Sequence, residues 1–200
     1  MDKQIIISIG REYGSGGLVI AENLAKRFNI PLYDVNTLDE IANEKNVDTK
    51  DLRLYDEIPK HRFFSRKIRG TESGSLQENV ANMQFDYLRK KASEGKSFVV
   101  VGRCAEEVLK EYKSLVSIFI LANKEDKLKR IMEVHKLNED DAWDQIVREN
   151  YRRKRYHNYY CKGKWGDSRN YEISINDSIL GIDKTTDLLE TYVKQRIEQL

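Results

Sequence analysis

The opening of the chain most constrains its fold, because an apolar run, a glycine cluster and a helical pattern follow one another there. The apolar run covers residues 5–9, the cluster covers 14–17, and apolar residues at helical spacing continue to Phe28. This order is typical of a phosphate-binding turn, in which backbone N–H groups and a helix N-terminus face an anion. The loop residues expected to bind phosphate are Gly14, Ser15, Gly16 and Gly17.

The loop departs from the standard sequence GxxxxGK[ST], whose lysine reaches the β- and γ-phosphates and whose hydroxyl binds Mg²⁺. Gly17 and Leu18 follow Gly16 here, so both of those side chains are missing. Arg11, on the approach to the loop, is either a cationic substitute for the lysine or a solvated loop arginine. The residues alone favour neither interpretation.

Composition excludes several classes of protein. A chain of 200 residues fits one domain, and its 35 basic and 33 acidic residues leave a formal net charge of +2, too near neutral for a dedicated nucleic-acid binder. No apolar stretch approaches the roughly 20 residues of a membrane span, and the first strand leaves no room for a signal peptide. Cys104 and Cys161 lack metal-ligand spacing, so we expect reduced thiols in a cytoplasmic protein and assign no direct metal ligand.

Short apolar runs alternate with helical patterns along the chain. This alternation predicts an α/β fold with a doubly wound, parallel, five-stranded sheet and helices on both faces. Ligands of such sheets bind at the carboxyl ends of the strands. The expected strands are 5–9, 31–33, 98–101, 116–121 and 171–175, and the expected helices are 18–28, 105–112, 124–135 and 185–197.

Two segments interrupt the alternation. Residues from about 36 to 93 are mostly helical in pattern, broken by Pro59 and a glycine-rich stretch, and we expect an inserted, substrate-covering subdomain there. Residues 148–167 are dense in Arg, Lys and Tyr, and we expect a lid. The core is then about 1–35, 94–147 and 168–200.

Two charged residues follow expected strands. Arg103 comes directly after the 98–101 run, where a guanidinium would point into the ligand crevice and match phosphate oxygens in a bidentate manner. A structural salt bridge is the alternative. Asp34 follows the second strand and could orient a nucleotide or hold Mg²⁺ through water, or it could serve as a helix N-cap. Cys104 is expected to be an inert buried thiol, because no histidine lies near it in the sequence.

The basic segment 148–155 supplies further candidates. On a helix, Arg148 and Arg152 share a face, as do Arg148 and Arg155, and converging arginines suit a transferring phosphoryl group, whose charge must be neutralised as it moves. A solvated face and a nucleic-acid contact are the alternatives. His157, a few residues on, is expected to be a polar surface residue.

These motifs together resemble the cytidylate-kinase-like family, relatives of the nucleoside monophosphate kinases. The resemblance runs in order from the first strand to the last helix and rests on specific stretches. They are Gly10-Arg11-Glu12-Tyr13-Gly14-Ser15-Gly16-Gly17, Pro31-Leu32-Tyr33-Asp34, Val101-Gly102-Arg103-Cys104-Ala105, Tyr159-Tyr160, Lys164-Trp165-Gly166-Asp167 and Ile175-Asn176-Asp177-Ser178.

The resemblance implies a P-loop kinase fold of the P-loop NTPase type, with a core, a nucleoside monophosphate (NMP)-binding insertion and a lid. It also implies transfer of a phosphoryl group from ATP, with Mg²⁺, to an acceptor such as CMP. By position, residues 14–17 would hold the donor phosphates and Arg103 would face the acceptor phosphate. Arg148, Arg152 and Arg153 would be the lid arginines. The chain departs from the family at Leu18, often basic in relatives, and at Asn150, where aspartate is common.

Three functions remain open at this point. The first is a phosphotransferase acting on small nucleotides. The second is a weak or inactive relative that binds nucleotide as a sensor, a pseudo-kinase, because loss of one charge-stabilising group commonly lowers a rate by about 10²–10³-fold. The third, a nucleic-acid-binding module, is disfavoured by the near-neutral charge. The sequence indicates neither the acceptor base nor whether the protein is a monomer or a homodimer.

Overall fold

The computed structural model describes residues 3–34, 39, 41–42 and 76–200, with side chains from residue 80 onward in the last range. Its centre is a five-stranded parallel sheet in the order β2-β3-β1-β4-β5. The expected fold class is confirmed. The strands are β1 (Ile6–Arg11), β2 (Leu32–Tyr33), β3 (Phe98–Val101), β4 (Leu115–Leu121) and β5 (Ile173–Asn176).

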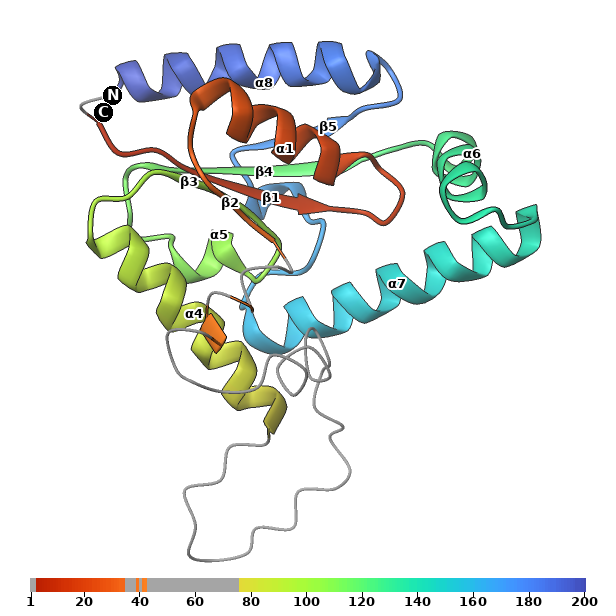
Figure 1. Ribbon diagram of the computed structural model, residues 1–200, viewed down its shortest axis with the longest axis horizontal. Helices are drawn as coiled ribbons and strands as arrows, with labels where there is room; N and C mark the ends of the chain where they lie inside the picture. Colours follow the sequence, from red (N-terminus) through yellow and green to blue (C-terminus); the bar gives the residue numbers. More distant parts are fainter. Residues whose placement is uncertain (1–2, 35–38, 40, 43–75) are drawn as a thin grey trace, which may run out of the picture.

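Helices cover both faces of the sheet (Figure 1). Helices α1 and α8 lie together on one face, and α4, α5 and α7 lie on the other. Helix α6 follows β4 at the carboxyl end of the sheet. The helices are α1 (Gly17–Phe28), α4 (Leu76–Ser93), α5 (Ala105–Val108), α6 (Lys124–His135), α7 (Glu139–Tyr160) and α8 (Gly181–Glu198).

The apolar run of β1 feeds two separate cores, because successive side chains of a strand point to opposite faces. Ile7 and Ile9 pack with Leu24 of α1 and Val193 of α8. Ile6 packs on the other face, with the aliphatic and aromatic side chains of α4 and α5. A strand buried on both faces needs a continuous apolar sequence, which is why the run has no polar alternation.

Helix α7 is longer than the sequence pattern indicated. The basic segment expected to begin at Arg148 is the second half of one helix of 22 residues that begins at Glu139. Asn138 caps its N-terminus by accepting a hydrogen bond from the backbone N–H of Asp141, and three acidic residues in the first turn match the helix dipole. Helix α5 ends at Val108, shorter than the expected 105–112.

The expected insertion at 36–93 falls mostly outside the described residues. Its last part, 76–93, forms helix α4, whose Leu88 and Ala92 are buried against the sheet. Residues 35–38, 40 and 43–75 lie outside the description. Within the described part of the chain, no helix combines the length and apolar character that a membrane crossing requires.

Candidate functional site: a phosphate-binding cleft

The glycine loop joins β1 to α1 at the carboxyl edge of the sheet. Gly16 has a φ of 75° and is the N-cap of α1, so its backbone is in the left-handed region that favours glycine. A Cβ on Gly17 would lie 2.6 Å from the Cβ of Arg11, which leaves no room for one. The Ser15 hydroxyl donates to the Glu12 carbonyl at 2.9 Å and is buried, so this hydroxyl shapes the loop instead of facing the cleft.

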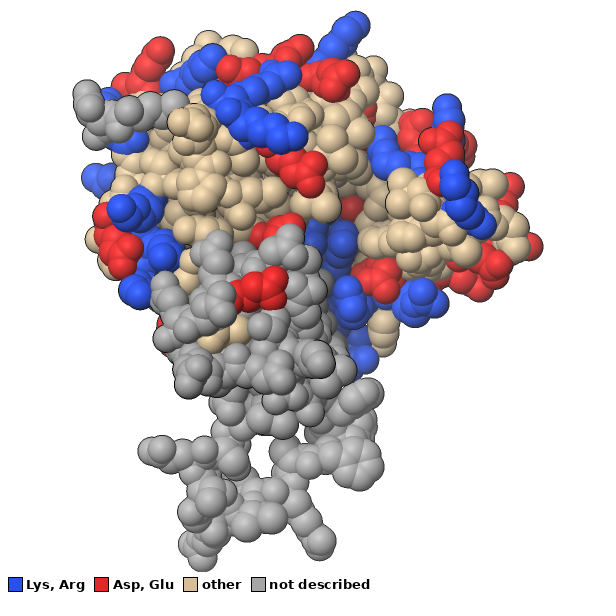
Figure 2. Space-filling view, in the orientation of Figure 1, with Lys and Arg blue, Asp and Glu red and all other residues tan. Residues whose placement is uncertain are grey.

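A cleft of about 430 Å³ lies over this loop. Figure 2 shows Lys and Arg side chains gathered in the hollow between the core and α6. Most of the sequence-predicted site residues meet in this cleft. The lining includes the loop glycines and charged and apolar side chains. The glycines are Gly14, Gly16 and Gly17, the charged residues are Arg11, Glu12, Asp34, Arg103, Arg130, Arg152 and Arg153, and the apolar residues are Leu18, Val19, Ile131 and Val134.

Arg103 occupies an unusual backbone. Gly102, Arg103 and Cys104 have φ values of 75°, 58° and 53°, three left-handed residues in succession between β3 and α5. The Arg103 residue is only 6% exposed, yet it lines the cleft. Non-glycine residues in this region are uncommon, and such strain persists where the surrounding structure enforces it. The turn therefore holds a guanidinium in a fixed position at the cleft wall.

The three arginines expected from the basic segment separate in the structure. Arg153 and Arg152 line the cleft, and Arg152 forms an ion pair of 2.9 Å with Glu149. Arg148 is not among the lining residues. Its side chain is 69% exposed and lies 3.9 Å from Glu149.

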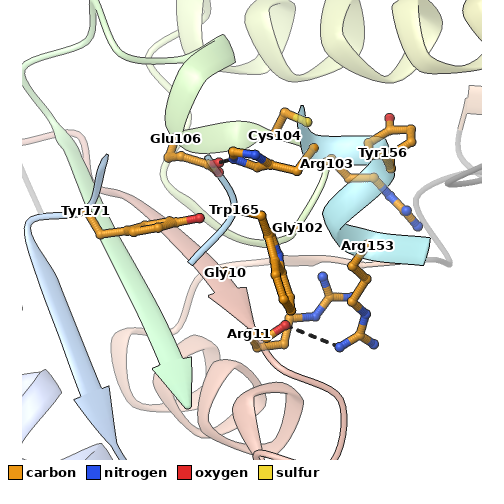
Figure 3. A pocket seen from close by; sticks show the side chains of 11 residues that line it. Gly10, Arg11, Gly102, Arg103, Cys104, Glu106, Arg153, Tyr156, Trp165 and Tyr171 are labelled. Carbon is orange, nitrogen blue, oxygen red and sulfur yellow. Dashed lines mark hydrogen bonds and ion pairs between the residues drawn. The ribbon is translucent and has the colours of Figure 1, made fainter. Parts of the chain in front are cut away.

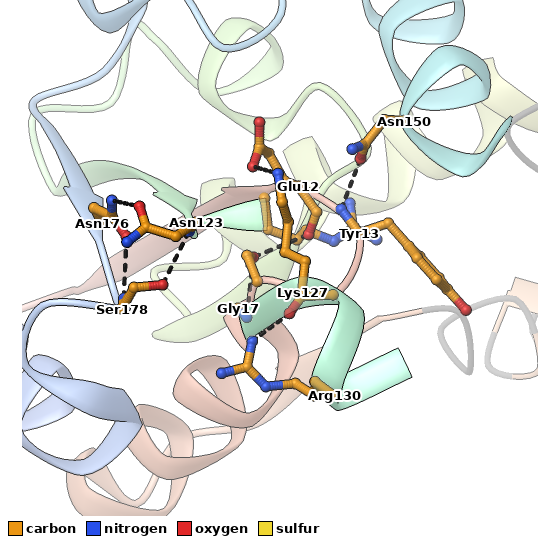
Figure 4. Close-up of polar contacts among 12 residues, drawn as sticks. Glu12, Tyr13, Gly17, Asn123, Lys127, Arg130, Asn150, Asn176 and Ser178 are labelled. Carbon is orange, nitrogen blue, oxygen red and sulfur yellow. Dashed lines mark hydrogen bonds and ion pairs between the residues drawn. The ribbon is translucent and has the colours of Figure 1, made fainter. Parts of the chain in front are cut away.

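Helix α6 contributes two cations that sequence reasoning missed (Figure 4). The Lys127 ammonium lies 2.7 Å from the Glu12 carboxylate, next to the loop that lacks its own lysine. Arg130 donates to the Gly14 carbonyl and forms an ion pair of 3.2 Å with Asp177. The sequence pattern predicts only a helix at Lys127 and Arg130. Their spacing of three residues on a helix that follows a sheet strand was the available signal.

Asp177 is fully buried beneath the loop, directly after β5. Burial raises the pKa of its carboxyl above the usual value, although Arg130 acts in the opposite direction. A Cβ on Gly16 would lie 3.0 Å from an Asp177 carboxylate oxygen. Arg130 therefore connects a buried carboxylate to the backbone of the glycine loop.

Helix α7 also contacts the loop. The Tyr13 backbone N–H donates to the Asn150 side-chain oxygen at 2.7 Å, and Arg153 donates to the Arg11 carbonyl at 3.3 Å. The Arg153 guanidinium lies 5.2 Å from the centre of the Tyr13 ring, within cation–π distance. These contacts fix the arginine-bearing helix against the phosphate loop.

A second buried group lies behind Arg103. The His157 ring nitrogen is 2.5 Å from a Glu106 carboxylate oxygen, and His157 is 6% exposed. The expectation of a surface histidine was therefore wrong, because α7 turns this position toward α5. Burial alone would lower the pKa of His157, but hydrogen bonds with Cys161 and Glu106 outweigh burial and raise it to about 10. Hydrogen bonds with Cys104 and then His157 lower the pKa of Cys161 to about 7, against the effect of burial.

A cavity of about 20 Å³ separates this group from the phosphate cleft (Figure 3). Trp165 lines it and packs edge-on against Phe119, with ring centres 5.5 Å apart. In the same turn, Arg169 holds the pKa of Asp167 at about 2 through hydrogen bonds to the carboxylate.

The amino-acid sequence matches the model of a known protein family over residues 6–179, which include the sheet and the cleft. The chain belongs to the cytidylate kinase-like family. The resemblance noted from the motifs is thereby confirmed. A search of curated proteins gave no match.

Solved structures agree with the family. The chain is similar to an uncharacterized protein from Eubacterium ventriosum, with 39% identity, a TM-score of 0.77 and coverage of 96% of this chain and 99% of that one. A shikimate kinase from Bacteroides thetaiotaomicron shares 11% identity, with a TM-score of 0.56 and coverage of 95% and 98%. A shikimate kinase from Acinetobacter baumannii, solved with shikimate, shares 11% identity, with a TM-score of 0.52 and coverage of 97% and 94%. The two kinases show the shared fold, and the family supports a nucleotide kinase-like function.

Proposed function

We propose that this protein binds ATP over the glycine loop and transfers its γ-phosphoryl group to a nucleoside monophosphate such as CMP. The observation that carries the proposal is the meeting of the glycine loop, Arg103 and the arginines of α6 and α7 in one cleft. Phosphoryl transfer requires positioning and neutralisation of charge, with little covalent chemistry from the protein. In this proposal the insertion at about 36–93 covers the acceptor and residues 148–167 act as the lid.

The loop fits the donor phosphates. Gly16 and Gly17 let the loop backbone pack closely on Asp177 and Arg11, whose side chains leave no room for a Cβ, and the adjoining N-terminus of α1 presents backbone N–H groups. Arg11 and Arg130 stand beside the loop as cations in place of the missing lysine. Arg153, at the opposite wall, would neutralise charge on the moving phosphoryl group.

Mg²⁺ fits the cleft through oxygen donors. Asp34 lines the cleft and supplies a carboxylate there. Asp34 would hold the ion, directly or through water. When bound, the ion supplies neutralising charge on the phosphate oxygens.

In the transfer step, an oxygen of the acceptor phosphate forms a bond to the γ-phosphorus while the bond to the β-phosphate oxygen breaks and ADP leaves. The acceptor phosphate is already ionised at neutral pH, so no general base has to remove a proton. Arg103 would hold this phosphate in line, because a guanidinium binds two of its oxygens at once.

A second function is favoured by one observation. The Lys127 ammonium, next to the loop, is paired with Glu12, and the loop itself has no lysine. A protein of this kind could bind nucleotide with negligible turnover and act as a sensor. The two functions predict the same binding and differ only in ADP formation.

The test offers the purified chain ATP, Mg²⁺ and each common nucleoside monophosphate in turn, and follows ADP formation. We expect turnover that depends on the monophosphate and falls by about 10²–10³-fold in Arg103→Ala. Arg196→Ala is the matched control, because Arg196 donates to the Lys113 carbonyl ahead of β4, at the opposite edge of the sheet. This control should keep the parental rate.

The other outcomes are also decisive. If ATP raises the melting temperature and no monophosphate yields ADP, the sensor replaces the kinase. If no nucleotide changes either the melting temperature or ADP formation, both functions are rejected.

A further inference from the structure

Four side chains with metal-binding chemistry meet behind the cleft. Cys104 and Glu106 come from the turn after β3 and from α5, whereas His157 and Cys161 come from the C-terminal end of α7. The ligand atoms of Glu106, His157 and Cys161 all lie within 4.8 Å of one another. Cys104 lies outside this three-residue group, but a hydrogen bond with its thiol lowers the pKa of Cys161, so the two thiols are neighbours. The two cysteines do not form a disulfide.

The ligand atoms of Glu106, His157 and Cys161 are close to the dimensions of three corners of a tetrahedral site. With metal–sulfur bonds of about 2.3 Å and metal–nitrogen or metal–oxygen bonds of about 2.0–2.2 Å, neighbouring ligand atoms of a tetrahedron are roughly 3.3–3.8 Å apart. Among these three, the His157–Glu106 separation is 2.5 Å and no separation exceeds 4.8 Å.

Space and burial agree with a single small ion. Cys104, Glu106 and His157 line the cavity of about 20 Å³, a volume that holds one water-sized particle. The Cys104, Glu106 and His157 residues are each at most 9% exposed. Figure 3 shows Glu106 and Cys104 on the wall of this cavity, on the side away from Arg11.

The histidine also has a typical outer partner. In protein metal sites, the ring nitrogen that does not bind the ion usually donates to a carbonyl or carboxylate oxygen, which fixes the tautomer. The second ring nitrogen of His157, Nδ1, lies 3.4 Å from the Asn158 side-chain oxygen. That oxygen also accepts from the backbone N–H of Trp165 at 2.8 Å, so its direction is set by the following turn.

We propose that Cys104, Glu106, His157 and Cys161 bind one zinc-class transition-metal ion. Two thiolates and an imidazole select Zn²⁺ and related ions over Mg²⁺ and Ca²⁺, which take oxygen ligands. Four protein ligands fill a tetrahedron, so the site is structural and leaves no position for a substrate. The ion would join the turn that carries Arg103 to the helix that carries Arg153. The lack of regular ligand spacing hid this site in the sequence, because its two halves lie about fifty residues apart.

The competing interpretation is a simple buried ion pair between Glu106 and His157. In that interpretation the two thiols only hydrogen-bond with each other and with His157. A metal site requires all four groups together, so the two interpretations differ in the effect of removing a thiol.

The test uses the full chain, reduced with a phosphine and stripped of metal, with no nucleotide present. Co²⁺ is titrated in as the spectroscopic probe and then displaced by Zn²⁺. We expect one equivalent of Co²⁺ to give the visible bands of tetrahedral cobalt and a near-ultraviolet thiolate charge-transfer band. Cys161→Ser should lower the intensity of the charge-transfer band, because one of the two thiolates is lost, and weaken binding by more than about 100-fold, beyond the roughly 10–100-fold cost of losing an outer partner.

Further variants keep the test decisive. Glu106→Gln retains the volume of the side chain and should weaken Co²⁺ binding, with secondary structure checked by circular dichroism. His135→Gln is the matched control, because His135 pairs with Tyr13 at the end of α6, outside the group. Its Co²⁺ spectrum should equal that of the parent chain.

Several results would overturn the metal site. They are an absent tetrahedral spectrum in the parent chain, an unchanged spectrum in Cys104→Ser/Cys161→Ser, and loss of the spectrum in His135→Gln. A Cys104–Cys161 crosslink found by mass spectrometry in air-exposed protein, together with no Co²⁺ binding when reduced, would assign the pair to redox chemistry instead. Because no nucleotide is involved, none of these results bears on the proposed kinase activity.

Discussion

At the scale of single residues, the backbone of Arg103 is the most informative feature. Each non-glycine residue held in the left-handed region costs roughly 1–2 kcal/mol, and Arg103 and Cys104 both adopt it. A cost of this kind persists only where the surrounding packing determines the conformation. The backbone conformation of the turn between β3 and α5 thus lowers the stability of the fold, at the position where a buried guanidinium reaches the cleft.

This strain can be measured with two variants that both remove the guanidinium. The free energy of unfolding, measured in urea, should be about 0.5–1 kcal/mol higher for Arg103→Gly than for Arg103→Ala. Glycine relieves about 1–2 kcal/mol of left-handed strain, which exceeds its backbone entropy cost. The control pair is Lys129→Gly and Lys129→Ala on the exposed side of α6. There alanine should be more stable by about 1 kcal/mol. If the alanine variant were more stable than the glycine variant at both positions, the backbone of Arg103 would not be strained.

The sequence indicated which residue types the cleft needs, but not all of their places. Arg103 and the loop glycines could be located because they directly follow apolar strands, whose carboxyl ends meet at one edge of any parallel sheet. The spacing of Lys127 and Arg130 indicates a shared helix face, but it does not place them at the loop, because the tilt that brings α6 over the loop depends on packing between distant segments. His157 was misjudged for the same reason, since its burial depends on α5.

At the scale of secondary-structure elements, α7 links the two walls of the cleft. Its middle contacts the loop through Asn150, and its C-terminal end packs against Cys104 and Phe85 through Tyr156 and neighbouring aromatic residues. An aspartate, which the resemblance implies at this position, would offer an oxygen to the Tyr13 N–H as Asn150 does, so that exchange would preserve the contact.

Asn150→Ala tests the contribution of this one hydrogen bond to the stability of the fold. The Tyr13 N–H loses its acceptor, so we expect the free energy of unfolding to fall by about 1–3 kcal/mol, measured in urea. Asn150→Asp retains an acceptor and should recover most of that loss. Asp144→Ala, at an exposed position of the same helix, should change stability by less than about 0.5 kcal/mol. Equal effects of Asn150→Ala and Asn150→Asp would show that the hydrogen bond does not stabilise the fold.

Element boundaries show where pattern reading succeeds. The bounds 124–135 of α6 agree with the prediction because apolar residues recur there at helical spacing. The start of α7 was missed because its first half is dominated by polar and acidic residues. Asn138 followed by three acidic residues was the capping signal that could have located it.

At the scale of the whole molecule, charge is concentrated although the total is small. The net charge is +2, whereas Arg11, Arg103, Arg130, Arg152 and Arg153 all line one cleft. Walls of low dielectric focus the field of such a group on a bound anion. Local arrangement, and not the sum over the surface, should therefore set the affinity for nucleotide.

Two variants of equal charge change test this statement. Arg152 and Lys110 are both ion-paired at a spacing of three residues, with side chains 46% and 47% exposed, but only Arg152 lines the cleft. Arg152→Gln should weaken binding of a non-hydrolysable ATP analogue by about threefold to tenfold, since a partly exposed charge contact contributes roughly 0.5–1.5 kcal/mol. Lys110→Gln should leave the dissociation constant from calorimetry unchanged. Equal losses in both variants would show that net charge sets the affinity.

The fold class followed from the alternation of apolar and helical segments, and the strand order did not. Neighbouring strands are decided by contacts between distant parts of the chain. Strand β1, for example, pairs with β3 and β4, and both lie far from β1 in the sequence. The carboxyl edge is common to every order of a parallel sheet. This is why the cleft could be anticipated while its exact walls could not.

The hydrogen bonds from α7 to the loop have a thermodynamic consequence. A phosphate group that settles in the loop and alters the bonds at Tyr13 and Arg11 also alters the energy of α7 in its resting position. Coupling between two binding events is reciprocal, so a ligand held by the α7 arginines must change the affinity of the loop by the same factor. Occupancy of the loop and occupancy of the arginine-bearing helix are thus linked quantities, and each can be measured through the other.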